Sequence, residues 1–427
     1  MKTEFKVKDI SLAEEGRLNV EWAENHMPVL MMIKERFEKE KPLKGVTVAG
    51  SIHVTKETAA LISTLQRGGA QLAWCGCNPL TTQDNVAAFL AKYGTTGEDQ
   101  PVSIYAWKGQ TAEEYYWCID RVLDVKPNVT LDDGCDLVFT AHTRRSQLLH
   151  DIVGGCEETT TGVKRLEAMV SDRALRYPII AVNNAVTKSD FDNIYGTGQG
   201  TLDAMMRLTS VLIAGKNFVV AGYGHCGSGV ARRAGGLGAR VIVTEVDPIK
   251  ALRAVMDGFT VMPMAEAVKV GDIFNTVTGC KDIITKDHFM DLKDGAILSN
   301  SGHFNVEVRV DQLEEIAKKK RRIRPLVDEY TLPNGRRVYL LAEGRLVNIS
   351  GAEGHPPEIM DMSFANQALC VEYLAKRGRE LEARVYDVPT EIDQGVAELK
   401  LQTMGMAIDR LSDEQARYLK SWKEGTQ

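Results

Sequence analysis

The chain of 427 residues is long enough for two or three domains of ordinary size. Hydrophobic residues make up 44% of it and charged residues 26%, which excludes a disordered, collagen-like or coiled-coil protein. Because 52 Lys and Arg stand against 58 Asp and Glu, the formal charge of −6 gives no electrostatic reason to expect binding to nucleic acid. A small-molecule substrate is therefore the favoured partner.

The sequence also lacks the signals of membrane insertion and secretion. The best apolar candidate, residues 210–224, is interrupted by Lys216 and Asn217 and falls short of the roughly 18 residues that cross a bilayer. The first ten residues have no signal-peptide core. We therefore expect a cytoplasmic protein with no membrane contact, whose eight cysteines stay reduced. Cys75 and Cys77 do not have the spacing of zinc ligands, so no metal site is expected.

Short apolar runs alternate with helix-length amphipathic stretches in two successive series, a rhythm typical of βαβ units. The apolar runs of the two series cover residues 46–51, 71–76, 102–107 and 179–184, then 217–224, 239–245, 272–279 and 295–302. This pattern predicts the α/β class, with two Rossmann-like, doubly wound parallel sheets. The basic run 318–322 follows an amphipathic helix, and we interpret it as the solvated end of that helix. Residues 411–427 predict a polar terminal helix and tail.

A glycine-rich turn opens the second series. Gly222, Gly224 and Gly227 follow an apolar run and precede a helical stretch, and the next strand ends at Glu245. In a Rossmann turn the first glycine permits the tight bend, the second lets the backbone approach a pyrophosphate, and the third lets helix and strand pack closely. An acid at the next strand end accepts hydrogen bonds from a ribose and repels a 2′-phosphate. The segment therefore predicts a site for NAD rather than NADP.

Segments rich in polar and titratable residues lie outside this turn, several of them directly after a strand. They cover residues 50–57, 131–134, 157–162, 183–193, 302–304 and 351–356. Ligands of open α/β sheets bind beyond the carboxyl ends of the strands, so we expect His53, Lys188 and His303 to meet in one cleft. Two plainer interpretations stay open, with His53 as a core histidine and Lys188 with Asp192 as a surface i,i+4 pair.

The order and spacing of these segments resemble the S-adenosyl-L-homocysteine hydrolase (adenosylhomocysteinase) family from about residue 21 to residue 423. The motifs that carry the resemblance include STLQRGGAQLAWCGCNPLTTQDNVAA, LDDGCDL, EETTTGV, VTKSDFDNIYG, VVAGYGHCGSG, NGRRVYLLAEGRLVN and GHP. The resemblance implies a discontinuous substrate-binding domain, residues 1–190 and 351–400, with an NAD-binding domain inserted at 191–350. It also implies a homotetramer with a C-terminal oligomerisation tail at 401–427.

The reaction implied by the resemblance is the reversible hydrolysis of S-adenosyl-L-homocysteine to adenosine and L-homocysteine, a step of the methyl cycle. The thioether at C5′ is a poor leaving group, and the neighbouring C4′ hydrogen is not acidic. Tightly bound NAD⁺ first oxidises the 3′-hydroxyl to a ketone, which acidifies C4′ and lets the thiolate leave by β-elimination. Water then adds, and the reduced cofactor restores the alcohol.

The resemblance also implies roles for individual residues. The catalytic residues are His53, Asp133, Lys188, Asp192 and His303. The substrate-binding residues are Thr55, Glu57, Glu158, Lys188, Asp192 and His355. The cofactor-binding residues are Thr159, Thr160, Thr161, Asn193, Gly222, Gly224, Gly227, Glu245, Asn348 and Gln415.

Lys188, desolvated, is expected to have a lowered pKa and to take the 3′-hydroxyl proton, while Asp192 fixes that hydroxyl or the lysine. His53 and Asp133 serve proton transfer at C4′ and C5′ in a division that stays open, and His303 lies near the nicotinamide. Glu158 is expected to hold the ribose hydroxyls of the substrate, and Thr55, Glu57 and His355 are expected to face its purine.

The chain departs from the family pattern at three places. The glycine-rich turn, commonly GDVGKG, here contains His225, Cys226 and Ser228, and Thr197 stands where a cysteine is common. The C-terminus keeps Gln415 but lacks the Lys- and Tyr-containing tail of many members, as in short-tailed archaeal and thermophilic forms. These changes affect cofactor binding rather than the acids and bases of the reaction.

Three other functions remain as alternatives. The nearest is hydrolysis of S-inosyl-L-homocysteine, although the Glu57 carboxylate favours an amino donor and ranks adenine above hypoxanthine. A catalytically silent NAD-binding regulator would carry a long N-terminal extension and altered catalytic positions, which this sequence does not show. A simple dehydrogenase that releases NADH is disfavoured because the catalytic segments match the hydrolases along their length.

Overall fold

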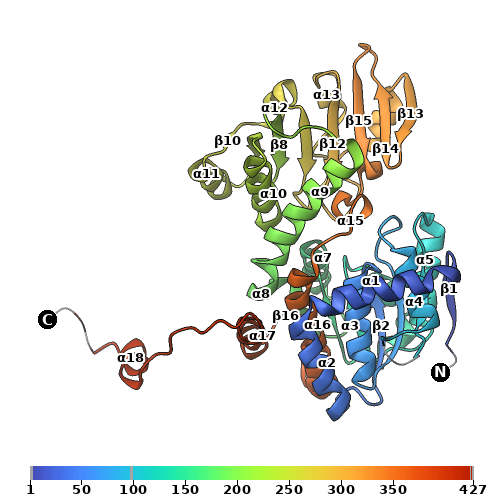
Figure 1. The fold of residues 1–427 in the computed structure, drawn as a ribbon, viewed down its shortest axis with the longest axis vertical. Helices are drawn as coiled ribbons and strands as arrows, with labels where there is room; N and C mark the ends of the chain where they lie inside the picture. The colour runs from blue at the N-terminus through green and yellow to red at the C-terminus, as the bar shows by residue number, and fades with distance from the viewer. Residues whose placement is uncertain (1–2, 97–99, 424, 426–427) are drawn as a thin grey trace.

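The computed structural model describes residues 3–96, 100–423 and 425, and within them two eight-stranded sheets form two lobes (Figure 1). In spatial order the first sheet contains β1 (Phe5–Val7), β4 (Ser103–Ala106), β3 (Gln71–Cys75), β2 (Thr47–Ser51), β5 (Val129–Asp132), β6 (Gly154–Glu157), β7 (Ile179–Ala181) and β16 (Val385–Asp387). The second contains β10 (Thr260–Val261), β9 (Arg240–Thr244), β8 (Asn217–Ala221), β11 (Ile273–Thr276), β12 (Ala296–Asn300), β15 (Arg337–Leu341), β14 (Val327–Thr331) and β13 (Lys319–Arg324). The α/β class and all eight predicted strands are confirmed.

Helices connect these strands and cover both sheets. Those before the second sheet are α1 (Ala13–Asn25), α2 (Pro28–Glu40), α3 (Lys56–Arg67), α4 (Asp84–Lys92), α5 (Ala112–Leu123), α6 (Asp136–Arg144), α7 (Thr160–Ser171), α8 (Val186–Ser189) and α9 (Thr197–Thr209). The others are α10 (His225–Gly236), α11 (Pro248–Met256), α12 (Met264–Val270), α13 (Lys286–Phe289), α14 (Val310–Ile316), α15 (Val347–Ser350), α16 (Pro357–Arg377), α17 (Thr390–Thr403) and α18 (Asp413–Leu419). A π-helical turn, Asp192–Gly196, precedes α9.

The two sheets differ at their edges. Every pairing in the first sheet is parallel, whereas at one edge of the second sheet β14 pairs antiparallel with both β15 and β13. The interpretation of the basic run 318–322 as a helix end is wrong, because these residues lead into and form most of β13. An edge strand tolerates a row of exposed charges, which also discourages pairing with another chain. Arg321 and Arg322 bind Glu329 and Asp328 on the neighbouring strand.

Strand order sets where a ligand can bind. In the first sheet the chain proceeds from β2 to β3 and β4 on one side, and then to β5, β6 and β7 on the other. The second sheet reverses in the same way between β8 and β11. Such switch points leave a crevice at the carboxyl ends of the strands, because the connecting segments diverge there. Each sheet therefore offers one crevice.

The chain returns to the first lobe after finishing the second sheet. Helix α16 buries Phe364 and Val371 in the core of the first lobe, where Leu61, Trp74 and Phe89 also lie. Burying one such side chain contributes roughly 1.5–3 kcal/mol. The strand β16 then pairs in parallel with β7. The first sheet is thus completed by residues on both sides of the second one.

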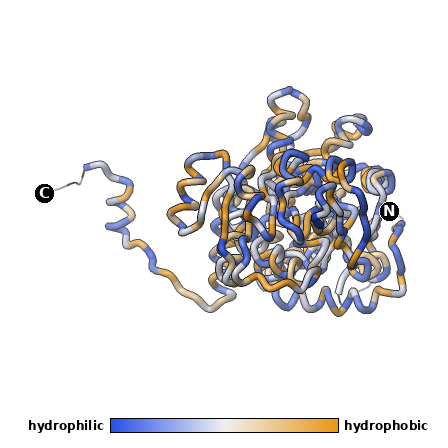
Figure 2. The backbone as a smooth tube through the Cα atoms, turned by 90° about the horizontal axis from the view of Figure 1, so that it is seen from above, coloured by the Kyte–Doolittle hydropathy of each residue, from blue (hydrophilic) through white to orange (hydrophobic). Residues whose placement is uncertain are grey.

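The last described residues form an arm that leaves the body of the molecule, as both Figure 1 and Figure 2 show. Its helix α18 confirms the predicted terminal helix, while residues 424, 426 and 427 lie outside the described residues. Large apolar side chains on the arm are exposed, namely Met404, Met406, Ile408, Leu411, Tyr418, Leu419 and Trp422. Among the described residues, no helix combines the length and the apolar composition needed to cross a bilayer.

Candidate active site

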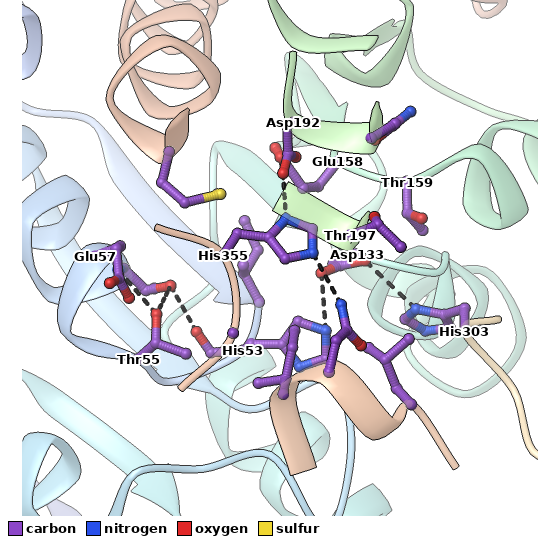
Figure 3. A pocket seen from close by; sticks show the side chains of 18 of the residues that line it. His53, Thr55, Glu57, Asp133, Glu158, Thr159, Asp192, Thr197, His303 and His355 are labelled. Atoms are coloured by element: carbon purple, nitrogen blue, oxygen red, sulfur yellow. Dashed lines mark hydrogen bonds and ion pairs between the residues drawn. The ribbon is translucent and has the colours of Figure 1, made fainter. Parts of the chain in front are cut away.

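A pocket between the two lobes brings together most of the predicted site residues (Figure 3). Those that line it are His53, Thr55, Glu57, Asp133, Glu158, Thr159, Lys188, Asp192, Asn193, His303, Asn348 and His355. Pairing of the strands explains part of this convergence, because Ser51, Asp132 and Glu157 stand in register on β2, β5 and β6. The residues that follow these strand ends therefore meet at the crevice of the first sheet.

The first cluster in the pocket consists of His53, Asp133 and His303. Asp133 lies between the two rings, with its Oδ2 3.4 Å from His53 Nε2 and its Oδ1 3.5 Å from His303 Nδ1. The Thr81 hydroxyl, 2.7 Å from His53 Nδ1, holds the other side of that ring. Burial, opposed in part by Asp133, lowers the pKa of His53 to about 4. His53 is therefore neutral near pH 7 and able to accept a proton.

The glycine at position 134 allows the His303 ring to lie close to the backbone beside Asp133. A Cβ atom there would lie 2.2 Å from His303 Nε2, and the φ of +106° also favours glycine. The loop that carries His303 is tied down by Asn300, whose amide donates to the carbonyls of Gly302 and Phe304. The geometry of this cluster is therefore built from both lobes.

The same three side chains form a compact donor set. One ligand atom from each of His53, Asp133 and His303 lies within 4.8 Å of the others, and all three residues are buried. Two imidazoles and a carboxylate are common ligands of divalent transition metals. The contacts also suit proton transfer, which needs only a carboxylate between two imidazoles.

The second cluster surrounds the ammonium group of Lys188. Its Nζ donates to Asn193 Oδ1 at 2.7 Å and lies 3.0 Å from Asp192 Oδ2 and 3.8 Å from Glu158 Oε1. Lys188 and Asp192 do form the i,i+4 pair considered from the sequence, but both are buried, so the interpretation as a surface pair is wrong. The π-helical turn that begins at Asp192 widens the helix where this pair sits.

The predicted lowering of the Lys188 pKa is also wrong. Burial lowers this pKa, but the carboxylates of Asp192 and Glu158 raise it more, so it lies above its ordinary value. Burial would likewise raise the pKa of Asp192, yet Lys188 and His355 hold it below its ordinary range. In the free protein this pair is therefore an ammonium and a carboxylate.

Glu158 and His355 complete the surroundings of Lys188. Burial raises the pKa of Glu158 to about 7, although Lys188 opposes the shift. Gln367 donates to Glu158 Oε2 at 2.5 Å, while Oε1 is buried without a hydrogen-bond partner among the described residues. His355 Nδ1 contacts Asp192, and its Nε2 lies 2.9 Å from the amide nitrogen of Asn348. The free oxygen of Glu158 is suited to accept a ligand hydroxyl.

Thr55 and Glu57 form the end of the pocket away from His303 (Figure 3). Thr55 is the N-cap of α3, and its hydroxyl accepts from the Thr58 amide at 3.4 Å. Such a cap contributes about 1 kcal/mol and fixes where the helix begins. Glu57 lies in the first turn, where its Oε1 is buried and lies 3.1 Å from the ammonium nitrogen of Lys56. This carboxylate can accept a hydrogen bond from a ligand.

The glycine-rich turn fits a dinucleotide. Gly222 has a φ of +102°, and a Cβ at Gly227 would lie 2.0 Å from the Gly222 carbonyl oxygen, so both positions need glycine. Next to Gly224 there is open space, where a phosphate could approach the backbone at the start of α10. The carboxylate of Glu245 lies beside the turn and accepts from the amide of Tyr223 at 2.7 Å. The geometry of this turn is thus compatible with the predicted roles, with a tight bend at Gly222, open space beside Gly224 and a close backbone approach at Gly227.

Not every predicted residue lies in the pocket. Thr160 contacts Asn183 through its hydroxyl, and Thr161 lies on the first turn of α7. Neither lines the pocket, and Gly222, Gly224, Gly227 and Glu245 lie outside its lining as well, although Cys226 of the same turn reaches it. Gln415 caps α18 on the exposed arm. Within one chain the arm therefore does not bring Gln415 to the other site residues.

Sequence reasoning missed several residues of the pocket and its support. Further lining residues are Ile52, Thr58, Thr197, Cys226, Ser301, Leu346, Ile349, Gly354, Met360 and Phe364. Behind the pocket, Asp132 accepts from the amide of Val138, and Glu157 accepts from the amide of Gly134. Asp132 lies in the motif LDDG and Glu157 in the motif EETTTG. In each motif it stands directly before the predicted acid, and this pair of neighbouring acids was the signal that could have revealed it.

Comparisons with known proteins agree with this geometry. The family model for S-adenosyl-L-homocysteine hydrolase matches residues 4–150, and the model for the NAD-binding domain of that family matches residues 193–354. An adenosylhomocysteinase from Saccharolobus solfataricus is 59% identical over 99% of this chain and all of its own length. An S-inosyl-L-homocysteine hydrolase from Methanocaldococcus jannaschii is 55% identical, and an adenosylhomocysteinase from Aquifex aeolicus 57%, each over 99% of this chain and 100% of its own.

Proposed function

Because the chain belongs to the S-adenosyl-L-homocysteine hydrolase family, we propose that it catalyses the reversible hydrolysis of S-adenosyl-L-homocysteine to adenosine and L-homocysteine with tightly bound NAD. The observation that carries the proposal is one pocket that contains both the Lys188 and Asp192 pair and the His53, Asp133 and His303 cluster. The first group suits a hydroxyl that must lose its proton, and the second suits proton transfer to and from carbon, sulfur and water.

The 3′-hydroxyl of the substrate would bind at Lys188 and Asp192. When bound, oxidised NAD supplies the hydride acceptor that makes C4′ acidic and later returns the hydride. Lys188 is an ammonium in the free protein, so it must release one proton to solvent before it can accept the proton of the 3′-hydroxyl. A ligand hydroxyl that weakens its contacts with Asp192 and Glu158 would lower its pKa and so favour that release. The free Oε1 of Glu158 would hold a neighbouring ribose hydroxyl.

Proton transfer at C4′ and C5′ belongs to the second cluster. His53 is neutral and buried, so it is available as a base. Asp133, between His53 and His303, would steady the imidazolium that forms when either ring takes a proton. We leave the division of these steps between His53 and Asp133 open, and His303 would lie beside the 3′ oxygen and the nicotinamide.

The purine would lie at Thr55 and Glu57, and His355, which contacts Asp192, would face it from the Lys188 side of the pocket. The buried Glu57 carboxylate, paired with the Lys56 ammonium, supports an exocyclic amine as the group it accepts from, which favours the adenosyl over the inosyl substrate. Hydrolysis of S-inosyl-L-homocysteine remains the second candidate, because relatives of nearly equal identity have that name.

The cofactor would be held by the glycine-rich turn, with Glu245 selecting NAD over NADP. Thr159, Thr160, Thr161, Asn193 and Asn348 are the proposed further contacts. The proposed domains are a substrate domain at 1–190 and 351–400, an NAD-binding domain at 191–350 and a tail at 401–427.

The exposed apolar side chains of the arm support a homotetramer in which Gln415 reaches the cofactor of a neighbouring subunit. Deleting residues 405–427 should lower both the sedimentation coefficient and the amount of NAD retained. An unchanged assembly would contradict this part of the proposal. The cysteines, all free among the described residues, fit a cytoplasmic location.

The decisive experiment measures homocysteine released from S-adenosyl-L-homocysteine by the purified protein, in the presence of a thiol reagent and with or without added NAD⁺. We expect release without added cofactor, and about one NAD retained per subunit. A silent regulatory relative would retain NAD and release no thiol, and a simple dehydrogenase would release reduced cofactor. Full-rate thiol release by protein free of nicotinamide would overturn the proposal.

A further inference from the structure

Lys56 carries a buried charge that the proposed reaction does not use. It is 6% exposed, and lysine is almost never buried to this degree unless it is paired. Its Nζ lies 3.1 Å from Glu57 Oε1 and 2.9 Å from Glu353 Oε2. The side chain thus connects the purine end of the pocket with the segment that returns from the second lobe. It does not line the pocket itself.

Several contacts hold this lysine in position. Gln83 accepts from the main-chain amide of Lys56 at 3.1 Å and donates to the main-chain carbonyl of Glu353 at 3.4 Å. Glu353 also lies 3.5 Å from Arg207 on α9. The ammonium is therefore anchored from the return segment while its other side faces Glu57.

The ammonium favours the charged form of the neighbouring carboxylate, Glu57. Glu57 is 1% exposed, and burial raises its pKa while Lys56 opposes that shift. An ionised carboxylate can only accept hydrogen bonds, whereas a neutral carboxyl group can also donate one. An amino group at C6 of a purine donates, and a carbonyl group at the same position accepts.

We propose that Lys56 is a specificity-determining residue, whose ammonium, anchored by Glu353, keeps Glu57 an acceptor and so favours a 6-aminopurine over a 6-oxopurine. This inference rests on the proposed function, because it concerns how the same pocket selects its nucleoside. Lys56 touches no reacting group, so it acts through Glu57.

The test compares S-adenosyl- and S-inosyl-L-homocysteine as substrates of the NAD-loaded enzyme. In Lys56→Met the ratio of the two kcat/KM values, adenosyl over inosyl, should fall about tenfold or more, because a hydrogen bond to a charged group is lost. The kcat for the adenosyl substrate should change little. Lys56→Arg should keep most of the ratio. Lys56→Gln replaces Lys56→Met if the methionine variant does not fold.

Two further variants separate this role from a purely structural one. Glu353→Gln removes the anchor and leaves the ammonium, so the ratio should fall less than in Lys56→Met. In a Glu57→Gln background, Lys56→Met should not change the ratio further, since the neutral amide has no charge to maintain. An equal loss of kcat/KM for both substrates in Lys56→Met would overturn the inference, as would an unchanged ratio.

The failure of this inference can be distinguished from failure of the proposed function. A wild-type enzyme that releases homocysteine from neither substrate refutes the proposed function. A wild-type enzyme that prefers the inosyl substrate refutes the role of Lys56 and leaves thioether hydrolysis intact.

Discussion

The pocket and the glycine-rich turn are built by opposite means. In the pocket, function depends on side chains that are charged, buried and close together, such as Lys188 between Asp192 and Glu158. At the turn it depends on side chains that are missing, since a Cβ at Gly227 would collide with the backbone at Gly222. Neighbouring residues can shift the pKa values of a charged cluster by degrees, whereas a side chain added to a glycine turn changes its backbone shape outright.

The largest effect is expected from the pocket. Lys188→Ala should lower kcat about a thousandfold, since it removes the group proposed to take the 3′-hydroxyl proton. Absorbance of the reduced nicotinamide after mixing with adenosine measures that step directly. Lys269→Ala, which breaks an exposed pair with Glu266, is the control and should change nothing. Cofactor reduction at the normal rate in Lys188→Ala would show that another group takes the proton.

A smaller effect, of a different kind, is expected at the turn. Gly227→Ala forces a backbone shift that costs on the order of 2 kcal/mol, so NAD affinity should fall about thirtyfold while the pocket residues stay intact. The NAD content after gel filtration is the measurement. Gly236→Ala, at the open end of the same helix, is the matched control. If both variants retained NAD equally, the turn would not be the cofactor site.

Charge in the pocket also predicts a dependence of stability on pH. The folded-state pKa of Glu158, about 7, is higher than its ordinary value, so this group favours folding at low pH and costs stability as pH rises from about 4.5 to 7. Glu158→Gln should therefore gain about 2 kcal/mol relative to wild type between pH 5 and pH 8, as measured by denaturant unfolding. Glu266→Gln on the surface should show no such gain. A constant difference across this range would mean that Glu158 is ionised throughout.

The smallest effect is expected outside both regions, at the basic edge strand. Arg321→Ala removes an exposed guanidinium from its pair with the buried Glu329 carboxylate and should lower the free energy of unfolding by about 1 kcal/mol, without changing kcat. Urea unfolding and a standard assay check both expectations. A large loss would mean that this edge supports the pocket or an interface.

The sequence alone predicts the architecture of the fold better than it predicts the charge states of the buried side chains. Apolar runs predict eight of the sixteen strands among the described residues. Those that they miss include β5 and β6, whose four-residue segments VTLD and GGCE are too short to stand out. These strands form because their neighbours on both sides pair with them. The sequence also predicts Asp133 and Glu158, which directly follow these two strands, through their polar motifs.

The error about Lys188 has a physical reason. Burial can be inferred from sequence, and burial alone lowers the pKa of a lysine. The pKa of Lys188 is raised by the nearby carboxylates of Asp192 and Glu158. Their closeness depends on a π-helical turn and on pairing between strands. The contact of His355 with Asp192 joins residues 163 positions apart, so only the folded chain reveals it.

The register of the strands limits how such a site can change. The residues at the ends of β2, β5 and β6 stand side by side, so the spacing of the groups beyond them follows from the distance of about 4.8 Å between strands. One residue inserted between Asp132 and Asp133 would leave the sheet intact and turn the carboxylate away from both rings. The reaction is therefore more easily altered by replacing a side chain than by lengthening a loop.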